Sequence, residues 1–277
     1  LFLVKFFRSP SLRYAIFCGV LLGLASLTKP AVIMLPVLLL IAFPIYVRYA
    51  LRSFSLRQMA RLGALLLVVL LTILPWSIRN YAAFHEVTVL NLSRATLGGW
   101  ALVSTMENQA LHVPSEESFL IYQQQRRSII EGETGGQVSG NPQQQGEALT
   151  RSVFKKIASD PLGYTAYSGK KFAYFWYASD SGKYEMLLAV LQGCALLLGV
   201  LGLVFFVRKD DWRKVFPLLL LLVYFPAFHT LSFTLARYSM PIMPLVMMFS
   251  IYGVVELHSM VKTRLQRAAS KVPVPIG

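Results

Sequence analysis

Three basic residues of this chain could form a binding site for an anion. Lys29 and Arg237 each lie in a short stretch between two apolar runs, and Arg79 directly follows a third run. Lys and Arg bind phosphate groups through charge-assisted hydrogen bonds. If the apolar runs cross a membrane, the three cations lie at one membrane face, where they would suit a lipid phosphate. The alternative is that each side chain only reaches from a helix end into the lipid headgroups.

The sequence indicates no metal site, no cofactor and no assignable catalytic residue. It has no Asp-x-Asp pair, which argues against a metal-dependent transferase that uses a nucleotide sugar. It also lacks a Walker phosphate loop, paired metal-ligand histidines and a Gly-x-Ser-x-Gly motif. His229 lies near the end of an apolar run, where it could handle a proton or serve as a hydrogen-bonded structural residue, and the second role is the more common.

Six apolar runs must position these residues. The chain of 277 residues is 55% hydrophobic and 14% charged, and its mean hydropathy is +0.55. A membrane-spanning helix needs about 20 apolar residues. The runs near that length are residues 14–28, 31–47, 62–78, 186–207, 215–233 and 241–261. We therefore predict an all-α polytopic membrane protein with about six transmembrane helices, which excludes a soluble globular protein.

The first two runs are predicted to form a helical hairpin. A single helix over residues 14–47 would be about 51 Å long at about 1.5 Å per residue, against a hydrocarbon core of about 30 Å. Pro30 disfavours a helical conformation at Lys29. The sequence therefore places Thr28, Lys29 and Pro30 in a tight turn at one membrane face.

Basic clusters between the runs predict the orientation of the chain. Fifteen of the 27 Lys and Arg residues fall into four clusters that share one side if every run spans the membrane. The clusters are Lys5, Arg8 and Arg13; Arg48, Arg52, Arg57 and Arg61; Arg208, Lys209, Arg213 and Lys214; and Lys262, Arg264, Arg267 and Lys271. The positive-inside rule makes that side cytoplasmic. The net charge of +14 is thereby explained without nucleic-acid binding.

This orientation predicts a multi-pass protein of the inner (cell) membrane, with both observed ends cytoplasmic and one large extracytoplasmic segment. The predicted parts are residues 1–78 with three transmembrane helices, residues 79–185 as a mixed, mainly helical cap, and residues 186–277 with three further helices and a cytoplasmic tail. Within the cap, Ser115 is a predicted helix start. Residues 132–147 are predicted to form a loop. The aromatic segment after Asp160-Pro161 is expected to lie in the headgroup layer.

Three segments of the chain read GVLLGLASLTKP (residues 19–30), LPWSIRNY (residues 74–81) and ARYSMPIMP (residues 236–244). They resemble segments of the GT-C membrane glycosyltransferases, in particular the polyprenyl-phosphate-dependent relatives of protein O-mannosyltransferases and of the lipid A aminoarabinose transferase. Residues 19–30 are similar to the GLLLGLAxLTKP hairpin of that family. Residues 74–81, LPWSIRNY, resemble its LPWxxRNY segment, and residues 236–244, ARYSMPIMP, resemble its RYxxPxxP turn. Gly98–Leu102 and the segment from Asp160-Pro161 through Lys170, Lys171 and Trp176 are similar to further family segments.

The resemblance implies an integral membrane glycosyltransferase that moves a sugar from an undecaprenyl- or dolichyl-type phosphate to a lipid, protein or glycan acceptor on the extracytoplasmic face. Lys29, Arg79, Arg237 and Tyr238 would bind the donor phosphate. The expected partners are this lipid-linked sugar, the acceptor and membrane lipids, and no nucleic acid.

The family's catalytic carboxylate belongs to the first external loop. The chain opens at Leu1 without an initiator Met, so we expect a piece of a longer protein with that carboxylate upstream. Glu86, Glu107 and Asp180 fall in the predicted external segment but match no acidic motif of the family.

Two other functions remain open from the sequence. A transporter or flippase of a lipid-linked glycan also places basic residues among membrane helices, although these usually interrupt the helices along a central path. The six runs of this chain contain almost no charge, and Glu256 is the only Asp, Glu, Lys or Arg residue within them. This pattern does not favour a transporter. A purely structural membrane subunit would leave Lys29 and Arg237 as ordinary headgroup contacts.

Overall fold

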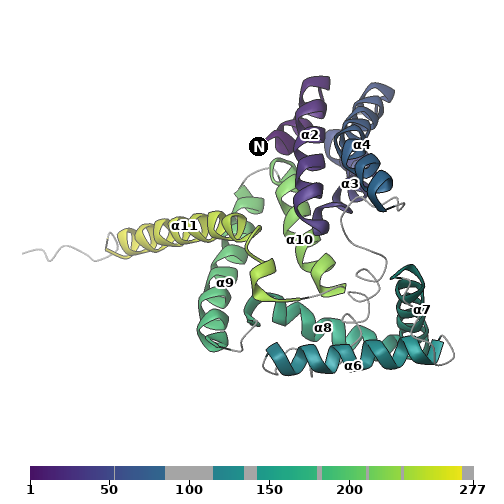
Figure 1. The fold of residues 1–277 in the computed structure, drawn as a ribbon. Helices are drawn as coiled ribbons and strands as arrows, with labels where there is room; N and C mark the ends of the chain where they lie inside the picture. The colour runs from purple at the N-terminus through teal and green to yellow at the C-terminus, as the bar shows by residue number, and fades with distance from the viewer. Residues whose placement is uncertain are drawn as a thin grey trace, which may run out of the picture.

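The computed structural model describes residues 1–52, 54–84, 115–133, 142–179, 183–209, 212–231 and 234–269. Within these ranges the secondary structure is helical and contains no strand (Figure 1). The elements are α1 (Phe2–Arg8), α2 (Leu12–Thr28), η1 (Pro30–Val32), α3 (Leu35–Tyr46), η2 (Val47–Leu51), α4 (Leu56–Phe84), α6 (Ser115–Glu133), α7 (Pro142–Ser159), α8 (Pro161–Tyr177), α9 (Glu185–Lys209), η4 (Trp212–Lys214), α10 (Phe216–Leu231), η5 (Ala236–Tyr238) and α11 (Met243–Ala269). The all-α prediction is confirmed for the described residues.

Each of the six apolar runs contains a helix. Three of these, α4, α9 and α11, are long and apolar enough to cross a membrane, which is characteristic of a membrane protein. The other three, α2, α3 with η2, and α10, are apolar but shorter. Helix α4 continues to Phe84, beyond the expected end of the third run at residue 78. Arg79 therefore lies within a helix.

Helices α2 and α4 pack closely because two glycines face α4. A Cβ atom on Gly19 would lie 2.7 Å from the Leu65 carbonyl oxygen, and one on Gly23 would lie 2.6 Å from the Thr72 Cβ. Small residues four positions apart allow such close approach between membrane helices. The contacts advance in the same direction along both helices, so α2 and α4 are parallel. The predicted topology requires this of its first and third spans.

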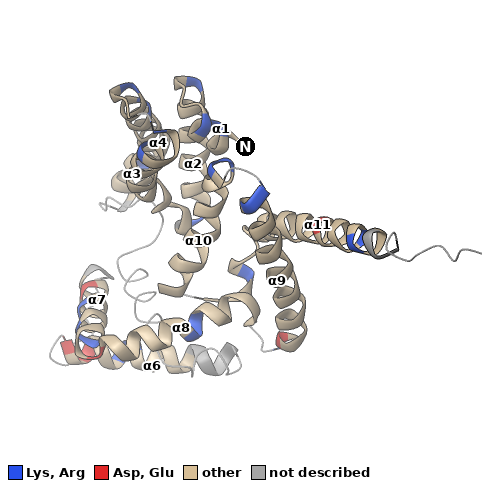
Figure 2. Cartoon of the chain, turned by 180° about the vertical axis from the view of Figure 1, so that it is seen from behind, with Lys and Arg blue, Asp and Glu red and all other residues tan. Residues whose placement is uncertain are grey.

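Helices α9 and α11 form a second glycine-dependent pair. The Ser239 hydroxyl, just before α11, donates to the Gln192 side chain (3.3 Å), and at the other end Lys209 forms an ion pair with Glu256. Between these contacts, a Cβ atom on Gly202 would clash with the backbone of α11. The contacts advance in the same direction along both helices, so α9 and α11 are also parallel. The C-terminal part of α11 then projects away from the other helices (Figures 1 and 2).

An aromatic cluster joins α1, α3 and α10 at one end of the molecule. The Phe7 ring lies 5.3 Å from Phe43 and 5.1 Å from Tyr46, and Tyr46 stacks on Phe216 at 5.1 Å. The Tyr46 hydroxyl donates to the Arg213 carbonyl oxygen (3.1 Å). The end of α3 thus lies beside α1, which leads into α2. The predicted break at Pro30 is confirmed, and α3 leads the chain back to the end of the molecule at which α2 begins.

The first three basic clusters meet at this aromatic end. The Arg8 guanidinium donates to the Lys214 carbonyl oxygen (3.4 Å), and the Arg61 guanidinium donates to the Pro10 carbonyl oxygen. Figure 2 shows Lys and Arg at the starts of α2 and α4 and at the end of α9. Lys29 follows the other end of α2, and Arg237 lies in η5, before the start of α11. The predicted separation of these two cations from the basic clusters is therefore present.

The predicted cap contains a helical hairpin with its own small core. Ile130, Leu149 and Val153 are buried between α6 and α7, and Lys155 forms an ion pair with Glu133 at 2.6 Å. Helix α6 begins at Ser115, as predicted. The loop predicted over residues 132–147 is wrong in its last part, because α7 begins at Pro142. Proline suits the first turn of a helix, where its missing N–H would have no helical partner.

Candidate anion-binding site

Lys29 lies at the turn that ends α2. It has an extended conformation with φ −134° and ψ 113°, as expected for a residue that precedes proline. Its ammonium lies 5.8 Å from the centre of the Phe225 ring and 5.6 Å from the centre of the Tyr238 ring. Burial lowers the pKa of this ammonium below its ordinary value. Lys29 is thus half-buried against aromatic rings of α10 and η5.

Arg237 and Tyr238 belong to the short helix η5, which is held in place by its backbone. The Ala236 N–H donates to the Ala178 carbonyl oxygen (2.8 Å). The Arg237 guanidinium carbon lies 5.2 Å from the centre of the Tyr238 ring, and a guanidinium N–H donates to the Tyr238 hydroxyl (3.3 Å). Lys29 and Arg237 therefore converge on one aromatic ring through cation–π contacts.

A buried histidine supports this ring. The His229 ring stacks on Tyr238, with centres 4.4 Å apart and an angle of 14° between planes. Phe175 stacks near His229 at 5.8 Å and 25°. The three rings come from α8, α10 and η5, and they form a continuous aromatic column. His229 is only 5% exposed.

Arg79, the third predicted cation, contacts groups of its own helix. Its guanidinium lies 4.9 Å from the Trp76 ring centre and donates to the Asn80 side chain (3.2 Å). All of these groups belong to α4 itself. Since α2 and α4 are parallel, Arg79 lies at the same end of the helix pair as Lys29, but the described contacts do not bring it onto Tyr238.

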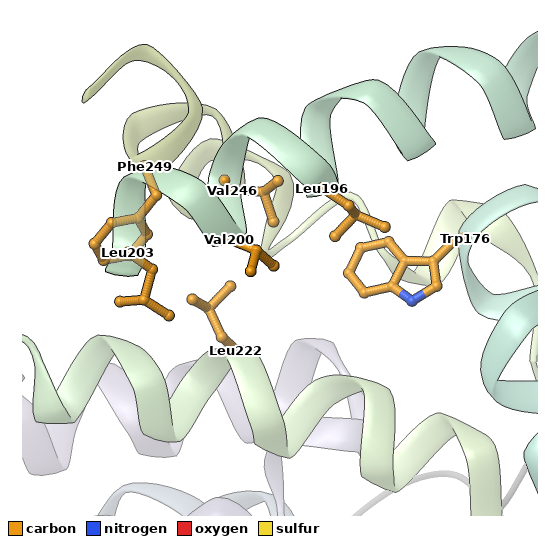
Figure 3. A pocket seen from close by; sticks show the side chains of 8 residues that line it. Trp176, Leu196, Val200, Leu203, Leu222, Val246 and Phe249 are labelled. Carbon is orange, nitrogen blue, oxygen red and sulfur yellow. The ribbon is translucent and has the colours of Figure 1, made fainter. Parts of the chain in front are cut away.

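Two hollows of mainly apolar lining lie beside the aromatic column. One, of about 220 Å³, is bordered by Arg237, Gln192 and Ser179 together with apolar side chains. The other, of about 180 Å³, lies among α9, α10 and α11, with Trp176 at one end and Leu203 at the other (Figure 3). Trp176 also packs edge-on against Phe175 at 4.9 Å. The hollows thus adjoin the two ends of the cation-bearing column.

Lys171 is a buried cation that the sequence did not distinguish from its neighbour Lys170. It is 2% exposed, and its ammonium lies 5.7 Å and 5.2 Å from the Tyr164 and Tyr167 ring centres. Burial lowers the pKa of Lys171 to about 8. Lys170 is exposed. The helical phase of α8 decides which lysine is buried, because consecutive residues lie about 100° apart around a helix.

The described residues contain no cluster of His, Cys, Asp and Glu that could hold a metal ion. Glu86, Glu107 and Asp180, the external carboxylates considered from the sequence, lie outside the described residues. The geometry therefore brings two cations onto one aromatic ring and leaves the general base unassigned.

Comparison with protein-family models, with curated proteins and with solved structures finds no match for this chain.

Proposed function

We propose that this chain is that of an integral membrane glycosyltransferase, which takes a sugar from a polyprenyl phosphate and passes it to an acceptor on the extracytoplasmic face. The observation that carries the proposal is the convergence of Lys29 and Arg237 on Tyr238. The two cations come from turns that are far apart in the sequence, and both lie away from the basic clusters. A phosphate placed between them would receive charge-assisted hydrogen bonds from an ammonium and a guanidinium.

The surroundings of these cations support a lipid phosphate. The two adjacent hollows have mainly apolar linings, which suits a hydrocarbon chain joined to the phosphate. In the proposed topology six helices cross the membrane, the basic clusters are cytoplasmic, and Lys29 and Arg237 lie at the outer face. The shorter helices α2, α3 and α10 would require local thinning of the bilayer or support from neighbouring helices.

The proposed chemistry divides the work between cations and a carboxylate. As the bond between the sugar C1 and the phosphate oxygen breaks, Lys29 and Arg237 would stabilise the negative charge on the departing lipid phosphate. The acceptor hydroxyl attacks C1, and a carboxylate receives its proton. We assign no residue of this chain to that last role.

The test is lipid-phosphate binding by the purified chain in lipid nanodiscs, with undecaprenyl phosphate as the probe. Lys29→Ala and Arg237→Ala should each weaken binding by about 10-fold or more, because a hydrogen bond to a charged group contributes about 1.5 to 3 kcal/mol. Arg237→Lys should recover only part of the loss, because an ammonium cannot replace a bidentate guanidinium.

Lys5→Ala is the matched control. Lys5 is exposed, and its ammonium lies 5.8 Å from the Tyr14 ring, so its substitution removes a similar lysine–tyrosine contact at the opposite end. Unchanged binding in both Lys29→Ala and Arg237→Ala would show that the two cations do not bind the phosphate and only contact lipid headgroups. In proteoliposomes, movement of a labelled lipid-linked sugar across the bilayer without transfer would instead support the transporter.

A further inference from the structure

We propose that His229 is a positioning residue for the anion site, because its imidazole fixes the Tyr238 ring on which Lys29 and Arg237 converge. This inference rests on the proposed function, since it concerns the same phosphate site. It adds a residue from α10 that touches neither the phosphate nor the sugar and acts through Tyr238.

The geometry of the ring pair carries the inference. The His229 and Tyr238 rings are nearly parallel, at 14°, with centres 4.4 Å apart. His229 thus covers one face of the tyrosine ring. Both cations lie within 6 Å of the ring centre, which is the range of a cation–π contact. A rotation of Tyr238 would therefore move the partner that the two cations share.

The surroundings of His229 restrict its own movement. Phe175 from α8 stacks near it, and the Phe228 ring meets it edge-on at 5.4 Å and 88°. The Thr234 hydroxyl donates to the His229 carbonyl oxygen, which joins the end of α10 to the segment leading into η5. Ring and backbone contacts of His229 therefore both hold η5 against α10.

Two substitutions separate stacking from simple space filling. His229→Leu keeps apolar volume but removes the ring, whereas His229→Phe keeps a ring that can stack. An aromatic pair contributes about 0.5 to 1.5 kcal/mol beyond its buried area, which corresponds to about 3- to 10-fold in affinity. We expect His229→Leu to weaken undecaprenyl phosphate binding in nanodiscs by that factor and His229→Phe to restore it.

Phe17→Leu is the matched control, because it removes a ring of α2 that stacks on Phe2 of α1 (5.2 Å and 21°), a stacked pair that belongs to another part of the structure. Its binding constant should equal that of the unchanged chain. Each affinity is measured on the folded fraction, with thermal unfolding recorded separately, so that a loss of stability is not counted as a loss of affinity. In a sugar-transfer assay, His229→Leu should raise the donor KM, and His229→Phe should restore it.

Normal binding by His229→Leu would overturn the inference, and so would equally weak binding by His229→Phe, because a stacking role requires the two variants to differ. The proposed function is judged by other variants. If Lys29→Ala and Arg237→Ala bind normally, the phosphate site itself is wrong. If they bind weakly while His229→Leu binds normally, only the role of His229 is wrong.

Discussion

The Lys29 ammonium lies 5.6 Å from the centre of the Tyr238 ring, although one residue follows the first apolar run and the other precedes the last. The Tyr224 hydroxyl supports this approach by donating to the Ala31 carbonyl oxygen, which ties α10 to the turn after Lys29. The candidate site is therefore built where three separate segments of the chain meet.

Two substitutions of Tyr238 test whether its ring holds Lys29 and Arg237 in position. Tyr238→Phe keeps the aromatic face and loses the hydroxyl that accepts from Arg237, so we expect at most a small loss of undecaprenyl phosphate affinity. Tyr238→Leu removes the aromatic face, and the loss of affinity should be about 2- to 30-fold, since a cation–π contact contributes about 0.5 to 2 kcal/mol. Equal affinities for the two variants would show that the ring plays no part.

An alanine substitution at Gly202 tests the close packing of α9 on α11. Gly202→Ala would place a methyl group against the Phe249 carbonyl oxygen and 2.8 Å from the Gly253 nitrogen, and overpacking of this kind typically costs about 1 to 3 kcal/mol. Gly193→Ala, in the same helix, meets nothing within 4 Å and should be neutral or stabilising. Thermal unfolding in detergent distinguishes them, and similar melting temperatures would contradict the close contact.

The burial of the Lys171 ammonium predicts that the stability of the protein depends on pH. Its folded pKa is about 8, against an ordinary value of 10.5, so the unfolded chain binds more protons between these pH values and stability rises with pH across that window. Lys171→Met should stabilise the protein by about 3 kcal/mol at pH 7, with the gain shrinking above pH 8. Lys170→Met is the exposed control and should change little. A gain that is independent of pH would rule out the buried charge as its cause.

The proposed orientation can be tested by thiol labelling in intact cells, in a Cys194→Ser background because Cys194 is exposed. A cysteine at Ser128, an exposed position of α6, should react with a membrane-impermeant reagent. A cysteine at Ser9, beside the first basic cluster, should react only after the membrane is permeabilised. The reverse pattern would invert the topology.

The general base, which is unassigned among the described residues, gives a prediction about catalysis. General acid–base assistance is typically worth about 10² to 10⁴ in rate, so loss of the base should slow sugar transfer by that factor and leave undecaprenyl phosphate binding in place. Rapid transfer of a radiolabelled sugar by this chain would place the base within it. Amide substitutions of Glu86, Glu107 and Asp180 would then identify the carboxylate.

The sequence by itself determined the helical content, because apolar runs of this length in a chain with few charges bury their backbone polar groups only as helices. It also determined the break at Pro30 and the start of α6 at Ser115, since both depend on local backbone chemistry. The separation of Lys29 and Arg237 from the basic clusters likewise follows from the order of runs and charges along the chain.

Tertiary structure decided which of the predicted site residues meet. Arg79 carries the same charge as Arg237, but it lies against Trp76 of its own helix, whereas Arg237 shares Tyr238 with Lys29. The support from His229 and the burial of Lys171 also depend on how α8, α10 and η5 pack against one another. Sequence spacing within one segment gives the phase of a helix, but it does not give the rotation of that helix against neighbours contributed by distant segments.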